Sequence, residues 1–281
     1  MLNIITNYHT HTVFCDGKDT AADMASAAFK NGVSILGFSS HAMYPFSSQW
    51  HIPAQGFEAY CTEISNLKKK YSGKMDILLG FEADYIPGIT MPSMSTYKEF
   101  NPDYLIGSVH YIGTPDGIFG IDDPTENVQQ GISSLFHGDG KAVVCEYFSL
   151  QREMLRKGDF LIWGHPDVVR KRNGLLHFFD ERDDWYRQEL KETARAASKA
   201  GIIAEINTGA IARKTMDSVY PSAEFLSLLH EENVPITLSS DAHSKETILT
   251  AFDRATLAAK QAGYSEVMYI NKQRQVLPQP L

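Results

Sequence analysis

The chain has 281 residues, of which 43% are hydrophobic and 21% charged, so it can bury a large core as an ordinary globular protein. Its net charge of −8 argues against nucleic acid as a main partner. No apolar run approaches the roughly eighteen residues that would span a bilayer, and residues 1–8 do not resemble a signal peptide. Three scattered cysteines are too few for a disulfide framework, which indicates the reducing cytoplasm.

The first half of the chain alternates predicted strands with predicted helices. Buried strands are predicted at four short apolar runs, residues 2–5, 33–38, 77–80 and 104–109. Amphipathic spacing predicts helices over residues 21–31 and 57–71. A Gly- and Asp-rich insertion at residues 113–140 is too long for a routine connection, so we expect a lid or a specificity loop there.

The second half continues the same alternation. Helices are predicted over residues 142–156, 183–200, 223–232 and 248–263. Strands are predicted at residues 160–163, 202–204 and 235–239, with a last strand at 266–270. Gly201 closes the helix before it, as glycine commonly does at a helix C-terminus. Nothing in the sequence divides the chain, so we expect one domain over residues 1–281.

Residues that bind metals follow the predicted strands. His9 and His11 lie two apart, so a strand that reaches them would point both imidazoles to one face, and Asp16 follows on the next loop. Six of the ten histidines lie at strand exits, together with carboxylates. The residues at the later exits are His41, Glu82, His110, His165, Glu205 with Asn207, and Asp241 with His243.

Alternating strands and helices imply a parallel sheet, and seven or eight such units imply closure into a barrel. Catalytic groups of such barrels converge at the C-terminal ends of the strands, which is where all these residues lie. An open doubly wound sheet fits less well, because its sites use one or two strand ends and this chain offers seven. We therefore predict an α/β fold, a (βα)7 TIM-like barrel.

The set of strand-end residues resembles that of the PHP (polymerase and histidinol phosphatase) superfamily, and within it the histidinol-phosphate phosphatases, over nearly the whole chain. The resemblance implies a distorted seven-stranded barrel with three divalent metals. Glu82 would bridge two of them, the first also bound by His9, His11 and Asp241, and the second by His110 and His165. The third would be bound by Asp16, His41 and His243. Some members have a histidine in place of Asp16, and a carboxylate there favours Mn or Fe(II) over Zn.

The function implied by the resemblance is hydrolysis of a phosphate monoester with two to three divalent ions, Zn, Mn or Fe. Such ions polarise phosphoryl oxygens and activate water. Glu82, Asp241 and His243 would then take part in catalysis as ligands. The expected substrate is L-histidinol phosphate, cleaved to L-histidinol and phosphate in histidine biosynthesis. The alternative substrate is another small phosphate ester or a nucleotide. An amidohydrolase and a non-catalytic metal-binding protein are further alternatives for the function.

Four residues outside the metal set are predicted to contact the substrate. Arg170 and Arg213 lie a few residues beyond strand exits, and arginine matches phosphate oxygens with a planar fork. Trp50 could stack on the substrate imidazole. Asn207 could contact the substrate at the barrel mouth, or serve there with Glu205 as a hydrogen-bonded support.

Four carboxylates complete the sequence-based predictions. Asp122 and Asp123 in the insertion could pair with the substrate ammonium group. Asp84 and Asp167 each follow a predicted ligand by two residues, so we expect them to orient imidazoles.

Overall fold

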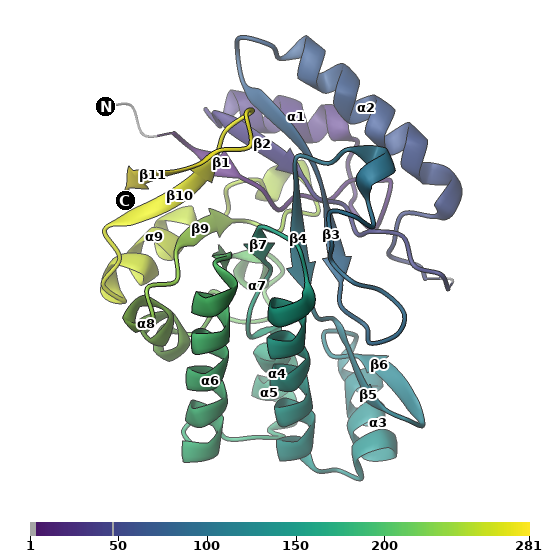
Figure 1. Ribbon diagram of the computed structural model, residues 1–281, viewed down its shortest axis with the longest axis vertical. Helices are drawn as coiled ribbons and strands as arrows, with labels where there is room; N and C mark the ends of the chain where they lie inside the picture. The colour runs from purple at the N-terminus through teal and green to yellow at the C-terminus, as the bar shows by residue number, and fades with distance from the viewer. Residues whose placement is uncertain (1–3, 47) are drawn as a thin grey trace.

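Seven parallel strands form a nearly closed barrel in the computed structural model, which describes residues 4–46 and 48–281 (Figure 1). Neighbouring strands follow the order β1-β2-β3-β4-β7-β8-β9. The strands are β1 (Thr6–Asn7), β2 (Ile35–Phe38), β3 (Asp76–Asp84), β4 (Tyr104–Ser108), β7 (Ile162–Trp163), β8 (Ile203–Asn207) and β9 (Ile236–Ser239). Every ladder between neighbours is parallel, which confirms the predicted barrel.

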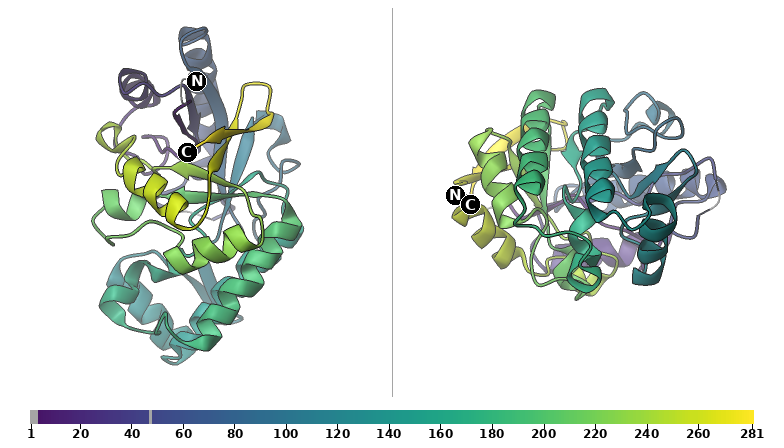
Figure 2. Two further views of the ribbon diagram at one scale, coloured as in Figure 1. Left: turned by 90° about the vertical axis from the view of Figure 1, so that its left-hand side faces the viewer. Right: turned by 90° about the horizontal axis from the view of Figure 1, so that it is seen from below.

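Helices surround the barrel, and α4 packs against α6 and α6 against α8 (Figures 1 and 2). Besides α3 (Thr125–Phe136) in the insertion, the longer helices between barrel strands and after β9 are α1 (Ala21–Lys30), α2 (Phe57–Lys70), α4 (Gly140–Lys157), α6 (Asp184–Ala200), α8 (Ala223–Glu231) and α9 (Phe252–Gln261). Their burial follows the helical period, as in α2, where Phe57, Tyr60, Ile64 and Leu67 face the strands. Across residues 4–46 and 48–281, no helix combines the length and apolarity needed to cross a bilayer.

The first and last barrel strands meet at the mouth of the barrel. Thr10 and Ala242 form an isolated parallel bridge beyond the ends of β1 and β9. The His11 amide donates to the Ala242 carbonyl at 2.9 Å, and the Ala242 amide donates to the His9 carbonyl at 3.2 Å. The barrel is therefore closed directly beside the predicted metal ligands.

A C-terminal hairpin covers the opposite end of the barrel. Strand β10 (Glu266–Ile270) pairs antiparallel with β11 (Val276–Pro280). The Tyr8 hydroxyl accepts a hydrogen bond from the Ile270 amide at 2.7 Å and donates one to its carbonyl at 3.1 Å. The predicted strand at 266–270 is confirmed, but it lies outside the parallel barrel.

Four predicted elements differ from the structure. The strand predicted at 77–80 extends to Asp84 as β3, so Glu82 lies within it. In the predicted strand 2–5, residues 2 and 3 lie outside the described residues, and β1 begins only at Thr6. The helix predicted to start at residue 248 starts at Phe252, because Ala251 has a φ of 58° that helix geometry excludes. The insertion is not an open loop: with the two residues before it, it forms β5 (Tyr111–Thr114), β6 (Gly117–Gly120) and α3 (Thr125–Phe136).

Tyr104 fills the barrel interior between Gly37 and Gly80, so neither position has room for a side chain. A Cβ at Gly80 would lie 2.5 Å from Tyr104 Cζ, and one at Gly37 would lie 2.3 Å from its hydroxyl oxygen. We expect Gly80→Ala to lower the free energy of unfolding by about 1–3 kcal/mol, because the ring must shift. Urea denaturation measures the change. The control is Gly174→Ala, whose new methyl group would meet nothing within 4 Å; equal midpoints for both variants would contradict the packing argument.

Candidate metal centre

The predicted metal-binding side chains converge at the mouth of the barrel. They come from segments that directly follow or end the parallel strands, so the sheet itself gathers them. Seven of the nine are buried: His9, His11, His41, Glu82, His110, His165 and Asp241. Asp16 and His243 lie at the rim, with their side chains 32% and 21% exposed.

Glu82 lies at the centre and directs each carboxylate oxygen to a different pair of imidazoles. Its Oε2 atom is 3.0 Å from His9 Nε2 and 3.5 Å from His11 Nε2. Its Oε1 atom is 2.8 Å from His165 Nε2 and 3.4 Å from His110 Nε2. One carboxylate therefore serves two neighbouring groups of donor atoms.

Asp241 completes the first of these groups. Its Oδ1 atom is 3.2 Å from His11 Nε2 and 3.7 Å from His9 Nε2. In the second group the two imidazoles lie close together, with His110 Nε2 and His165 Nε2 3.1 Å apart. Both groups match those implied by the resemblance.

A third group forms around Asp16. Asp16 Oδ2 is 3.1 Å from His243 Nε2, and Asp16 Oδ1 is 3.8 Å from both His41 Nε2 and His11 Nδ1. His41 also places its Nδ1 atom 3.0 Å from Glu82 Oε2. His11 and His41 therefore touch two groups each, which the sequence pattern alone did not indicate.

Buried imidazole nitrogens at the centre lack hydrogen-bond partners among residues 4–46 and 48–281. They include His9 Nε2, His11 Nε2 and His41 Nδ1, whose approaches to the Glu82 carboxylate are close in distance but do not have hydrogen-bond geometry. Leaving a buried polar nitrogen unpaired costs about 1–3 kcal/mol, so each needs another partner. Imidazole and carboxylate groups are common ligands of Zn, Mn and Fe ions, and the residues present thus fit a cluster of divalent cations.

Electrostatics at the centre favour ionised carboxylates. Burial would raise the pKa of Glu82, but the surrounding imidazoles, His9 foremost, hold it well below its usual range. Burial opposes the charged form of His110 as well, yet Asp84 and Glu82 raise its pKa to about 10. His11 differs, since burial lowers its pKa to about 3. A cation bound beside His110 would displace a proton from it.

Two carboxylates outside the cluster orient its imidazoles. Glu205 Oε2 is 2.7 Å from His9 Nδ1, and Asp84 Oδ1 is 2.8 Å from His110 Nδ1. Such contacts fix the ring so that the other nitrogen points to the metal. The prediction for Asp84 is confirmed. The prediction for Asp167 is wrong, because its Oδ2 accepts from the Ser222 amide and pairs with Arg170.

Asn207 is fully buried behind the cluster and does not line the cavity. Its amide donates to Glu205 Oε1 at 2.7 Å and to Asp241 Oδ2 at 3.4 Å. The structure therefore does not bring Asn207 to a substrate position. It supports the two carboxylates, which was the other role considered for it.

The structure separates the two predicted arginines. Arg213 lines the cavity and donates to Asp241 Oδ2 at 2.7 Å. This approach requires a glycine at position 209, because a Cβ there would lie 2.6 Å from the guanidinium of Arg213. Arg170 does not line it: its Nε donates to Glu181 at 2.7 Å. Lys171, which the sequence did not single out, lies at the cavity instead. The 3₁₀-helical segment Val168–Arg172 determines which side chain of this basic run points inward.

The cavity beside the cluster has a volume of about 260 Å³. Trp50 forms part of its wall, with the ring centroid 4.6 Å from that of His41 and 5.4 Å from that of His110. The lining also includes Asp122, Asp123 and Lys171. The cavity thus combines the candidate metal ligands with an aromatic side chain and both signs of charge.

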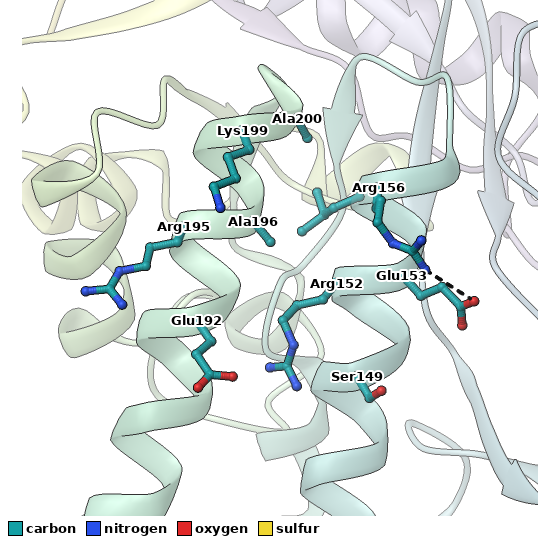
Figure 3. A pocket seen from close by; sticks show the side chains of 10 residues that line it. Ser149, Arg152, Glu153, Arg156, Glu192, Arg195, Ala196, Lys199 and Ala200 are labelled. Atoms are coloured by element: carbon teal, nitrogen blue, oxygen red, sulfur yellow. Dashed lines mark ion pairs between the residues drawn. The ribbon is translucent and has the colours of Figure 1, made fainter.

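A larger hollow of about 660 Å³ lies outside the barrel between α4 and α6 (Figure 3). Most of its cations already have carboxylate partners: Arg152 pairs with Glu189, Arg156 with Glu153 and Arg195 with Glu232. It contains no histidine or cysteine. We therefore place the chemistry at the barrel mouth.

The chain is similar to known proteins over most of its length. Residues 7–209 match the family model of the PHP domain. A Deinococcus radiodurans protein named "Probable histidinol-phosphatase" is 27% identical over 273 residues, which cover 95% of this chain and 97% of that protein. The histidinol-phosphatase of Bacillus subtilis is 26% identical over 262 residues, covering 87% of this chain and 96% of that protein.

Solved structures share the fold. The HisK structure from Listeria monocytogenes superposes with a TM-score of 0.79 at 20% identity, covering 89% of this chain and 99% of that one. HisK from Lactococcus lactis, solved with Zn, L-histidinol and phosphate, gives a TM-score of 0.66 at 20% identity and covers 94% of this chain and 96% of that one.

Arg170 should matter for stability, because Asp167 is fully buried and Arg170 is only 10% exposed at its side chain. We expect Arg170→Ala to lower the free energy of unfolding by about 3 kcal/mol, since it leaves a buried carboxylate without its cation. Chemical denaturation measures this, with Arg182→Ala as the control, whose ion pair has an 89% exposed arginine. If the Arg170→Ala protein keeps the parental stability but fails to bind phosphate, Arg170 would instead be a substrate-binding residue.

Proposed function

This chain belongs to the PHP domain family, and we propose that it is a metal-dependent phosphomonoesterase that hydrolyses L-histidinol phosphate to L-histidinol and phosphate. The observation that carries the proposal is the convergence of two donor groups on the two oxygens of Glu82. Relatives named as histidinol-phosphatases that align along nearly their whole length support the substrate.

Two to three divalent cations, Zn, Mn or Fe, would be held by the three groups of donor atoms. His9, His11 and Asp241 would hold one, His110 and His165 another, and Glu82 would contribute an oxygen to each. A third would use Asp16, His41 and His243. Zn in the Lactococcus lactis HisK structure supports zinc as one of these cations. When bound, the ions supply Lewis acidity that stabilises charge on phosphoryl oxygens and activates water at neutral pH.

The protein's own cations would orient the phosphate. Arg213 and Lys171 both line the cavity, and each is already held by a carboxylate, Asp241 and Asp122 respectively. Held donors lose little freedom when they bind an anion, so they favour one orientation of the phosphoryl group. Trp50 would cover the organic part of the substrate. The three free cysteines agree with the cytoplasm as the expected compartment.

Glu82→Gln should be the most damaging single change at the cluster. The amide carries no charge and would weaken two metal sites together, so we expect at least one metal equivalent to be lost. Activity should fall by more than the roughly 100-fold that outer contacts can cost. Elemental analysis and phosphate release measure both effects. The matched control is Glu205→Gln, because among the described residues the Glu205 carboxylate contacts only the His9 imidazole, the His165 amide and the Asn207 side chain. Full activity in a metal-free parent protein would refute the proposal.

The substrate is tested by the ratio of kcat/KM for L-histidinol phosphate to that for p-nitrophenyl phosphate, which lacks the amine and the imidazole. We expect a ratio of at least about tenfold, or ~1.4 kcal/mol of discrimination in the transition state. Steady-state kinetics on the metal-loaded protein gives the value. A ratio near one would indicate a general phosphoesterase, whereas higher activity on nucleotides would indicate the alternative substrate class.

A further inference from the structure

The carboxylate of Asp84 is buried behind the second group of donor atoms, and its two oxygens have different partners. Oδ1 accepts a hydrogen bond from the His110 amide at 2.9 Å and lies 2.8 Å from His110 Nδ1. Oδ2 accepts a hydrogen bond from the hydroxyl group of Tyr44. Tyr44 therefore holds the oxygen that does not contact the candidate metal ligand His110.

A second buried side chain faces the same oxygen. His51 Nε2 is 3.9 Å from Asp84 Oδ2, and the side chain of His51 is only 4% exposed. Neither ring nitrogen of His51 has a hydrogen-bond partner in the parts of the chain that the structure describes, residues 4–46 and 48–281. A buried polar atom without a partner is unfavourable, so His51 is available as a further donor to this carboxylate.

Both side chains belong to the connection between β2 and α2, which is held at each end beside the cluster. The Ala42 amide donates to the Glu82 carbonyl at 2.8 Å, and the Ile52 amide donates to the His41 carbonyl at 3.1 Å. Asp84 lies two residues after Glu82 on β3, so both carboxylates point to the same face of the strand. The two backbone hydrogen bonds thus keep the connection next to Asp84.

We propose that Tyr44 is a positioning residue of the metal centre, with His51 as a second donor to the same carboxylate. By holding Oδ2 of Asp84, Tyr44 keeps Oδ1 on His110 Nδ1, which directs His110 Nε2 towards a cation in the second donor group. Tyr44, His51 and Asp84 are not among the residues that line the cavity, so this role does not involve contact with the substrate. The inference rests on the proposed function and deepens it, because it names residues outside the cavity on which metal binding depends.

The ring and the hydroxyl group of Tyr44 have separable roles. The ring packs in an aromatic cluster, with its centroid 4.9 Å from that of Phe46 and 5.8 Å from that of Tyr111. A purely structural role would depend on these ring contacts. Tyr44→Phe keeps the ring and removes only the donor to Asp84, so this variant isolates the positioning role.

The first measurement follows the transfer of Zn²⁺ from the zinc-loaded protein to a chromophoric chelator. We expect at least one zinc equivalent of Tyr44→Phe to bind about tenfold more weakly, as is typical when an outer partner of a ligand is lost. The control is Tyr264→Phe, whose lost hydroxyl donates to the Val234 carbonyl at 2.9 Å, two residues before β9 begins. This control should keep the parental affinity. Adding His51→Phe to Tyr44→Phe should weaken zinc binding further, and an unchanged affinity would remove His51 from the inference.

A nuclear magnetic resonance measurement assigns the effect to one imidazole. In zinc-loaded protein with isotopically labelled histidine, the Nδ1–H resonance of His110 should shift in Tyr44→Phe. The resonance of His9, whose Nδ1 lies 2.7 Å from Glu205 Oε2, should not shift. Parental zinc affinity in Tyr44→Phe, or a weaker affinity with an unshifted His110 resonance, would overturn this inference alone. A zinc-loaded parent protein that hydrolyses no phosphate monoester would overturn the proposed function, whatever the affinity of Tyr44→Phe.

Discussion

The buried carboxylate of Glu82 is the constraint on which the mouth of the barrel depends. An anion removed from water costs several kcal/mol unless positive or hydrogen-donating groups surround it. Here the imidazoles that follow β1, β2, β4 and β7 surround it, because parallel strands deliver their C-terminal ends to one place. The same arrangement leaves imidazole nitrogens unpaired, and metal ions would satisfy both needs at once.

Most of the barrel and the cluster could be predicted from the sequence, for one physical reason. A short apolar run fixes a buried strand, and the polar residue that ends it must then leave the core at the mouth. His41, His110 and His165 each follow this rule, so their convergence did not require any tertiary information. The helical spacing of the apolar residues Phe57, Tyr60, Ile64 and Leu67 in α2 was equally informative.

What could not be predicted depends on side-chain direction beyond the strand ends. The segment after His165 contains consecutive basic residues, and only the 3₁₀-helical turn of Val168–Arg172 shows that Lys171 lines the cavity while Arg170 does not. The insertion was misjudged because its glycines suggested a loop, whereas in the structure they allow tight packing. Gly131 lies against Phe119, where a Cβ would come within 2.3 Å of the ring.

The bridge between Thr10 and Ala242 connects positions near the two ends of the sequence, and this has a consequence for the order of assembly. His9 and His11 leave the ribosome early, whereas Asp241 and His243 leave it last. The long-range closure is therefore slow to form, and the groups of donor atoms that include Asp241 or His243 cannot be complete on a shorter nascent chain. Metal capture by the full cluster is a property of the finished protein, and truncated translation products cannot compete for the same ions with equal affinity.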